Sequence, residues 1–105
     1  MASFGQTLAQ ARRKAGLSQR QLAARILKED GEAISPQYLN DLERDRRNPP
    51  ARHLLGQLAA RLDLPPDYLD FLAGQLPEDL RDGNYAPDAV QAAFHAFRRS
   101  LRPSD

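Results

Sequence analysis

The chain has 105 residues, of which 41% are hydrophobic, and its formal net charge is +1. This length fits one small domain with a modest core. Because there is no cysteine, disulfides, thiolate metal sites and thiol nucleophiles are excluded. No apolar run is long enough to span a membrane and the first residues lack a signal-peptide pattern, so we expect a cytoplasmic protein.

The charges are unevenly distributed along the chain. Residues 1–63 contain 11 Lys and Arg against 7 Asp and Glu, a net charge of +4. Residues 64–105 contain 4 against 7, a net charge of −3. A basic front half favours a polyanionic partner, and chance scatter in a short chain is the alternative.

Two helices are predicted before residue 30. The first covers residues 3–15, with one apolar face formed by Phe4, Leu8, Ala11 and Ala15. Gly16 follows this helix, and glycine is the residue that most commonly ends one. The second begins at a capping-box pattern of Ser18 and Gln21, with Leu17 and Leu22 spaced as a hydrophobic staple. We expect it to continue to Lys28 or Glu29, with Leu22, Ala23 and Ile26 facing inward, before a turn centred on Gly31.

A third helix starts at Ser35, with Pro36 in its first turn and Leu39 and Leu42 pointing into the core. Its opposite, polar face is formed by Gln37, Asn40, Asp41 and Arg44. The pair Pro49-Pro50 prevents the helix from continuing.

Apolar spacing then predicts a fourth helix over residues 51–62 and a short fifth one over residues 65–72. Residues 73–86 form a connector with one turn at 77–80, and a last helix covers residues 87–101. That helix carries a narrow apolar seam, made of Val90, Phe94, Phe97 and Leu101. No segment alternates with period two, so the fold class is all-α.

Two capped helix starts, a turn between them and a polar second helix indicate a helix-turn-helix unit. The polar face of the second helix offers groups that can hydrogen-bond base edges in a major groove. The residues that follow it supply donors for the flanking phosphates, namely Arg44, Arg46, Arg47 and Asn48.

Residues 4–72, about two-thirds of the chain, resemble the Cro/C1 repressor type of helix-turn-helix domain, also called the Xre family. The similarity is carried by "LAQARRKAGLSQRQLAARI", "ISPQYLNDLERDRRNPP" and "LLGQLAARLDLPPDYL". It implies a five-helix, lambda-repressor-like DNA-binding domain over residues 1–73. Residues 74–105 would be a connector and a C-terminal helix for dimerisation or interaction.

The resemblance also implies roles for individual residues. Gln19 matches a glutamine that binds a phosphate, and Gln37 matches a position that reads bases. The neighbouring groove-facing or phosphate-facing positions are Ser35, Pro36, Tyr38, Asn40 and Asp41. Arg12 and Glu43 match an ion pair that ties the first helix to the third.

Three positions depart from the family pattern. Seven residues separate Ile26 from Ile34, where a turn of about three is usual. Pro36 has no side-chain donor, and Asp45 stands where the family commonly has glycine.

Some side chains have two interpretations. Asp41 could accept a hydrogen bond from a cytosine amino group, but we expect it to pair with Arg44 or Arg20.

His53 and His95 have no partner at ligand spacing, so we expect neither to bind a metal. No catalytic constellation and no cofactor motif is found.

The apolar seam of the last helix, made of Val90, Phe94, Phe97 and Leu101, has two interpretations. It either packs on the fifth helix or, as we expect, joins two chains.

The sequence therefore predicts a non-enzymatic bacterial regulator that binds double-stranded DNA as a homodimer, most simply a repressor. One alternative is an antitoxin-like or adaptor protein that binds a protein partner through its C-terminal third. Another is an interaction module that has kept this fold without DNA binding.

Overall fold

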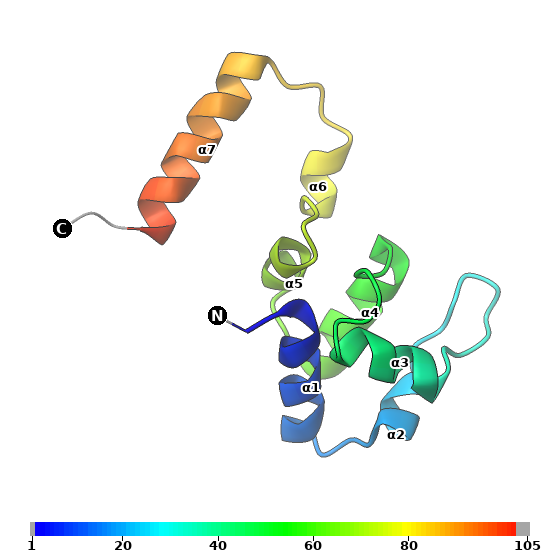
Figure 1. Ribbon diagram of the computed structural model, residues 1–105. Coiled ribbons are helices and arrows are strands. Elements are labelled where there is room, and N and C mark those ends of the chain that lie inside the picture. Colours follow the sequence, from blue (N-terminus) through cyan, green and yellow to red (C-terminus); the bar gives the residue numbers. More distant parts are fainter. Residues whose placement is uncertain (1, 103–105) are drawn as a thin grey trace.

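The computed structural model describes residues 2–102, and in this range the regular elements are helices (Figure 1). In chain order they are α1 (Phe4–Lys14), α2 (Gln19–Ala23), α3 (Pro36–Glu43), α4 (Arg52–Leu62), α5 (Pro66–Leu72), α6 (Glu78–Arg81) and α7 (Pro87–Leu101). One isolated antiparallel bridge joins Leu27 to Ala33. Within the described range, none of the helices combines the length and apolarity that crossing a bilayer requires. The predicted all-α fold class is confirmed.

Helices α1 to α5 pack around one hydrophobic core. Helix α1 contacts α3 and α4, α2 contacts α3, and α4 contacts α5. The fully buried side chains at its centre are Leu8, Leu22, Ile26, Leu39, Leu42, Leu55, Leu58 and Leu69. Ala15, which the sequence placed on the apolar face of the first helix, is the C-cap of α1 and is exposed.

The helix starts lie where the capping patterns predicted them. Ser18 accepts a hydrogen bond from the backbone N–H of Gln21, whose side chain accepts in return from the Ser18 N–H. Ser35 accepts from the N–H of Tyr38 at 3.0 Å, and Pro36 occupies the first turn of α3. These contacts satisfy backbone donors that would otherwise lack a partner at a helix start.

Helix α2 is shorter than predicted. It ends at Ala23 instead of continuing to Lys28 or Glu29. The N–H groups of Arg25 and Ile26 bond carbonyls three residues back, at 2.9 and 3.2 Å, so the last turn tightens and the chain leaves the helix. Ile26 nevertheless points into the core, fully buried.

The additional residues between α2 and α3 form a small hairpin, residues 27–33, which Figure 1 shows as a loop projecting beside α3 and α4. Its base is closed by the N–H of Ile34, which donates to the carbonyl of Ile26 at 2.9 Å. The side chain of Gln57, on α4, also fastens it. The Gln57 amide accepts from the Leu27 N–H and donates to the Leu27 carbonyl, both at 2.7 Å.

The chain beyond α5 leads away from this cluster, and α7 stands apart from it (Figure 1). The seam residues of α7 are all exposed, from 38% for Val90 to 58% for Leu101. The Phe97 ring meets Phe71 of α5 edge to face, with centroids 6.0 Å apart, and Phe94 lies 6.5 Å from Phe97. Helix α7 therefore meets α5 through the seam residue Phe97, while the seam residues stay exposed.

Candidate nucleic-acid interface

Helix α3 presents its predicted polar face to the outside. Leu39 and Leu42 are fully buried, which fixes the helix on the core and turns the residues between them outward. Pro36 and Gln37 are exposed, and Asn40 and Asp41 are half-buried. A short helix with a buried apolar side thus carries a row of side-chain amide and carboxylate groups on its accessible side.

Asn40 connects this row to the start of α2. Its side-chain oxygen accepts from Gln19 Nε2 at 3.1 Å and from Arg44 Nε at 3.2 Å. The same Gln19 nitrogen donates to Glu43 Oε1 at 2.9 Å. Both hydrogens of the Gln19 amide are then used inside the protein, so this side chain can donate to a phosphate only by giving up one of these bonds.

Asp41 pairs with a different residue than predicted. Gln37 Nε2 donates to Asp41 Oδ1 at 3.0 Å. Among residues 2–102, Asp41 forms no ion pair with Arg44 or Arg20. Residues four apart lie one above the other on a helix, which also applies to Gln37 and Asp41. Arg44 is instead held by the amide oxygen of Asn40.

An ion pair joins α1 to α3 beneath this face. Arg12 Nε lies 2.7 Å from Glu43 Oε2 and Arg12 Nη2 lies 3.0 Å from Glu43 Oε1, a two-point contact. Arg12 Nη1 also donates to the Leu17 carbonyl at 2.9 Å. The side chains are only 11% and 4% exposed. The hydrogen bond to Glu43 raises the pKa of Arg12 above its ordinary value, so the guanidinium keeps its charge.

The turn after α3 is fastened to the start of α1 by Asp45. Its backbone adopts a left-handed φ of 57°, which explains why this position commonly holds glycine. The Asp45 carboxylate accepts from the Gly5 N–H at 2.9 Å and from the Ser3 hydroxyl. The aspartate thus caps α1 while it forms the turn, a role that the sequence comparison with the family pattern did not reveal.

Gly5 is required at this junction. A Cβ built on it would collide with the backbone carbonyl oxygens of Leu42 and Glu43 at the end of α3. The two helices therefore approach closely at a position where only glycine fits. Neither Gly5 nor Gln57 was singled out from the sequence, because each acts through a contact with a segment 30 or more residues away.

The cationic loop continues from this turn. Arg44, Arg46, Arg47 and Asn48 are all exposed. The Arg46 N–H donates to the Asp41 carbonyl at 2.9 Å, which keeps the loop close to α3. The Arg47 guanidinium lies over the Tyr38 ring, 5.3 Å from its centroid. Since Tyr38 itself packs against the core, this cation–π contact orients Arg47 beside the α3 face.

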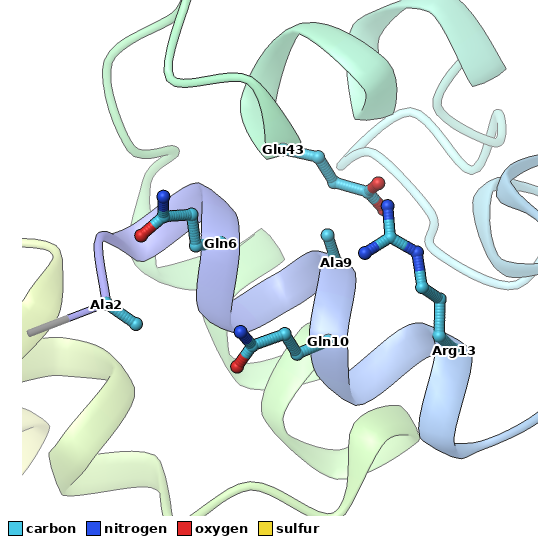
Figure 2. A pocket seen from close by; sticks show the side chains of 6 residues that line it. All are labelled: Ala2, Gln6, Ala9, Gln10, Arg13 and Glu43. Atoms are coloured by element: carbon cyan, nitrogen blue, oxygen red, sulfur yellow. The ribbon is translucent and has the colours of Figure 1, made fainter.

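An open hollow of about 450 Å³ lies along α1 next to this region (Figure 2). It is lined by Ala2, Gln6, Ala9, Gln10, Arg13 and Glu43. In Figure 2 the Arg13 side chain extends from α1 toward the Glu43 carboxylate. The lining offers two side-chain amides, the Arg13 guanidinium and the Glu43 carboxylate, so the hollow extends the polar surface beside α3.

The two histidines lie outside this face. His53 Nε2 is 3.3 Å from Gln57 Nε2, and His95 Nε2 is 3.4 Å from Gln91 Nε2. Within residues 2–102 there is no group of three His, Cys, Asp or Glu that could hold a metal ion.

Comparisons with known proteins agree with this geometry. The model of a family described as helix-turn-helix matches residues 8–69. No curated protein matches the chain significantly.

Solved structures with the same fold were also found. "Crystal structure of the master regulator for biofilm formation SinR in complex with DNA" is 29% identical, with a TM-score of 0.52 over 63% of this chain and 95% of that one. The clp gene regulator ClgR from Corynebacterium glutamicum is 26% identical, with a TM-score of 0.50 over 94% and 86%. A SinR/SinI protein complex, 22% identical with a TM-score of 0.50 over 90% and 78%, shares the fold alone. The chain therefore belongs to the helix-turn-helix family of the Cro/C1, or Xre, type.

Proposed function

We propose that this protein is a sequence-specific DNA-binding transcriptional regulator that acts as a dimeric repressor in the cytoplasm. The observation that carries the proposal is the α3 face, in which Gln37, Asn40 and Asp41 stand on a buried apolar base and lead into the exposed Arg44, Arg46 and Arg47. Such a helix can enter a major groove, because its outer side offers hydrogen-bonding groups to base edges. In this proposal the arginines after it contact the phosphates that flank the groove.

The comparisons support the same role. SinR, whose solved complex contains DNA, is similar to 63% of this chain, and ClgR is described as a gene regulator. In our proposal Gln37 contacts bases together with Pro36, Asn40 and Asp41. Ser35, Tyr38, Arg44, Arg46, Arg47 and Asn48 contact phosphates, and Gln19 contributes by holding Asn40 and Glu43 in place.

The dimer is assigned to residues 74–105, and DNA binding to residues 1–73. The support is the open seam of α7, where Phe94, Phe97 and Leu101 are each more than 40% exposed. A second copy would cover this apolar surface and bring a second recognition helix to the next major groove, about 34 Å along the duplex. A repressor of this kind acts by occupying its site and blocking polymerase.

A protein partner is the second candidate for the same surface. The acidic C-terminal part, net −3 over residues 64–105, and the open α7 seam would suit an adaptor or antitoxin-like function. The arginines beside Gln37 favour DNA binding as the main role, because an adaptor has no need of them at that place.

A salt-titrated mobility-shift assay tests the proposal. The probes are the duplex upstream of the protein's own gene and a random duplex of equal length. We expect tighter binding to the upstream duplex and a steep loss of affinity as salt rises, because phosphate contacts release counterions. Equal and weak binding to both probes at low salt would contradict sequence-specific DNA binding and favour the adaptor function.

A further inference from the structure

The orientation of the Gln37 amide is fixed by its neighbour. Gln37 Nε2 donates to Asp41 Oδ1 at 3.0 Å. An ionised carboxylate only accepts hydrogen bonds, so the nitrogen of the amide, and not its oxygen, must face Asp41. Gln37 is exposed while Asp41 is half-buried. The exposed glutamine is therefore paired with a half-buried carboxylate one helical turn further on.

This contact limits what Gln37 can offer to a base. A glutamine amide has two N–H donors and one acceptor oxygen. One N–H is used by Asp41, so a single N–H and the oxygen Oε1 remain. In a major groove adenine presents an amino donor beside the acceptor N7, whereas guanine presents two acceptors, O6 and N7. The remaining groups of Gln37 complement adenine, and they lack the second donor that guanine would need.

We propose that Asp41 is a specificity-determining residue, which makes Gln37 select adenine and reject guanine at the base pair that it contacts. The inference rests on the proposed DNA binding and adds the identity of a base. The second oxygen of Asp41 acts in the same direction, because a carboxylate near the base edge attracts an amino group and repels O6.

The side-chain amide of Asn40 is oriented the other way, with its oxygen and not its nitrogen facing another side chain. Asn40 Oδ1 accepts from Arg44 Nε at 3.2 Å, and a guanidinium only donates, so the oxygen of the Asn40 amide must face Arg44. Gln19 donates to the same oxygen at 3.1 Å. Both N–H groups of Asn40 therefore remain for acceptors. The α3 face thus contains two different amides. The Gln37 amide complements a base edge that has one donor and one acceptor, whereas the free N–H groups of Asn40 bind acceptors only.

Selection of duplexes from a random library tests the inference. Full-length protein is used to enrich duplexes, and the affinity of the enriched site is then measured with adenine or guanine at the position that depends on Gln37. That position is identified as the one whose preference disappears in Gln37→Ala. We expect the parent protein to lose about tenfold or more in affinity when adenine is replaced by guanine.

Asp41→Ala and Asp41→Leu release the second N–H of Gln37, so we expect the adenine-to-guanine ratio to fall to about threefold or less in both. Glu29→Gln is the matched control. It removes one negative charge from the exposed hairpin and should keep the ratio of the parent. Thermal melts of all variants verify that each is folded before its ratio is compared.

The outcomes separate the two levels of the argument. If the parent enriches no duplex, both the proposed function and this inference are overturned. If it enriches a site but prefers guanine at the Gln37-dependent position, the inference alone is overturned. An adenine-to-guanine ratio that is unchanged in both Asp41 variants also overturns it, because Gln37 would then discriminate without its neighbour.

Discussion

The Asp45 carboxylate accepts a hydrogen bond from the Gly5 N–H at 2.9 Å, so the turn after α3 caps the start of α1. The two residues are 40 positions apart in the sequence. An acidic group at a helix N-terminus is favourable, because it meets unpaired N–H groups and the positive end of the helix dipole. The left-handed backbone of Asp45, with φ of 57°, opposes this gain in part.

Substitutions at Asp45 should separate these two effects. Asp45→Ala loses the cap and keeps the unfavourable φ, so we expect the free energy of unfolding to fall by about 2 kcal/mol. Asp45→Gly loses the cap but relieves the backbone, so it should lose less. Chemical denaturation measures both. An alanine variant as stable as the parent would show that the carboxylate contributes nothing.

Gly5→Ala should destabilise the protein, although alanine favours helices. The new Cβ would collide with backbone oxygens of Leu42 and Glu43, and we expect a loss of about 1–3 kcal/mol. Gly56→Ala is the matched control, because a Cβ there meets nothing within 4 Å in the middle of α4. That variant should gain about 0.5–1 kcal/mol. Equal melting temperatures for the two variants would contradict the close approach of α1 and α3.

The Arg12–Glu43 pair should behave as a buried ion pair. Arg12→Met or Glu43→Leu alone leaves one charge without its partner, so each should lose about 3–5 kcal/mol. The double variant removes both charges and should be more stable than either single variant. A double variant whose loss equals the sum of the single losses would show that the two residues are not coupled.

Arg46→Ala combined with Arg47→Ala should weaken binding to every duplex and flatten the dependence of affinity on salt by about one to two units. Arg98→Ala combined with Arg99→Ala removes the same charge from α7 and serves as the control. Fluorescence anisotropy over a salt series gives the slopes. If both double variants show the slope of the parent, the loop after α3 does not contact phosphates.

Phe94→Asp should give a folded monomer if the α7 seam joins two chains. Affinity for a two-site operator should then fall by roughly a hundredfold, because the second recognition helix no longer arrives tethered. Ala92→Asp, on the other side of α7, should remain dimeric. Sedimentation of the parent and both variants measures whether each is a monomer or a dimer. A monomeric parent at tens of micromolar would contradict the dimer, and a Phe94 variant with a much lower melting temperature would indicate packing within one chain.

The helix starts could be predicted because they depend on local patterns. Ser18 with Gln21 and Ser35 with Pro36 specify their own hydrogen bonds within four residues of sequence. The end of α2 could not be predicted, because the residues after Ala23 suit a helix. The Leu27 backbone instead forms two hydrogen bonds with Gln57, 30 residues further along.

The candidate site was predictable to a similar extent. The polar row of α3 follows from the spacing of Leu39 and Leu42, and the arginines follow it directly in the chain. The hydrogen-bond partner of Asp41 could not be predicted. Opposite charge suggested Arg44, whereas the geometry of the helix pairs Asp41 with Gln37. Asp45 stood out only as a departure from glycine, since its contact with Gly5 leaves no local pattern.

The hairpin of residues 27–33 is secured at its base by the Ile26–Ile34 backbone bond and by Gln57. Its exposed residues 28–32 make no contribution to the core. The chain can therefore be lengthened between Glu29 and Gly31 without disturbing the recognition helix, since loop closure depends only weakly on loop length. This gives the experimenter a place for a peptide tag or a fluorophore, close enough to α3 to report when a duplex arrives and outside the residues that would contact it.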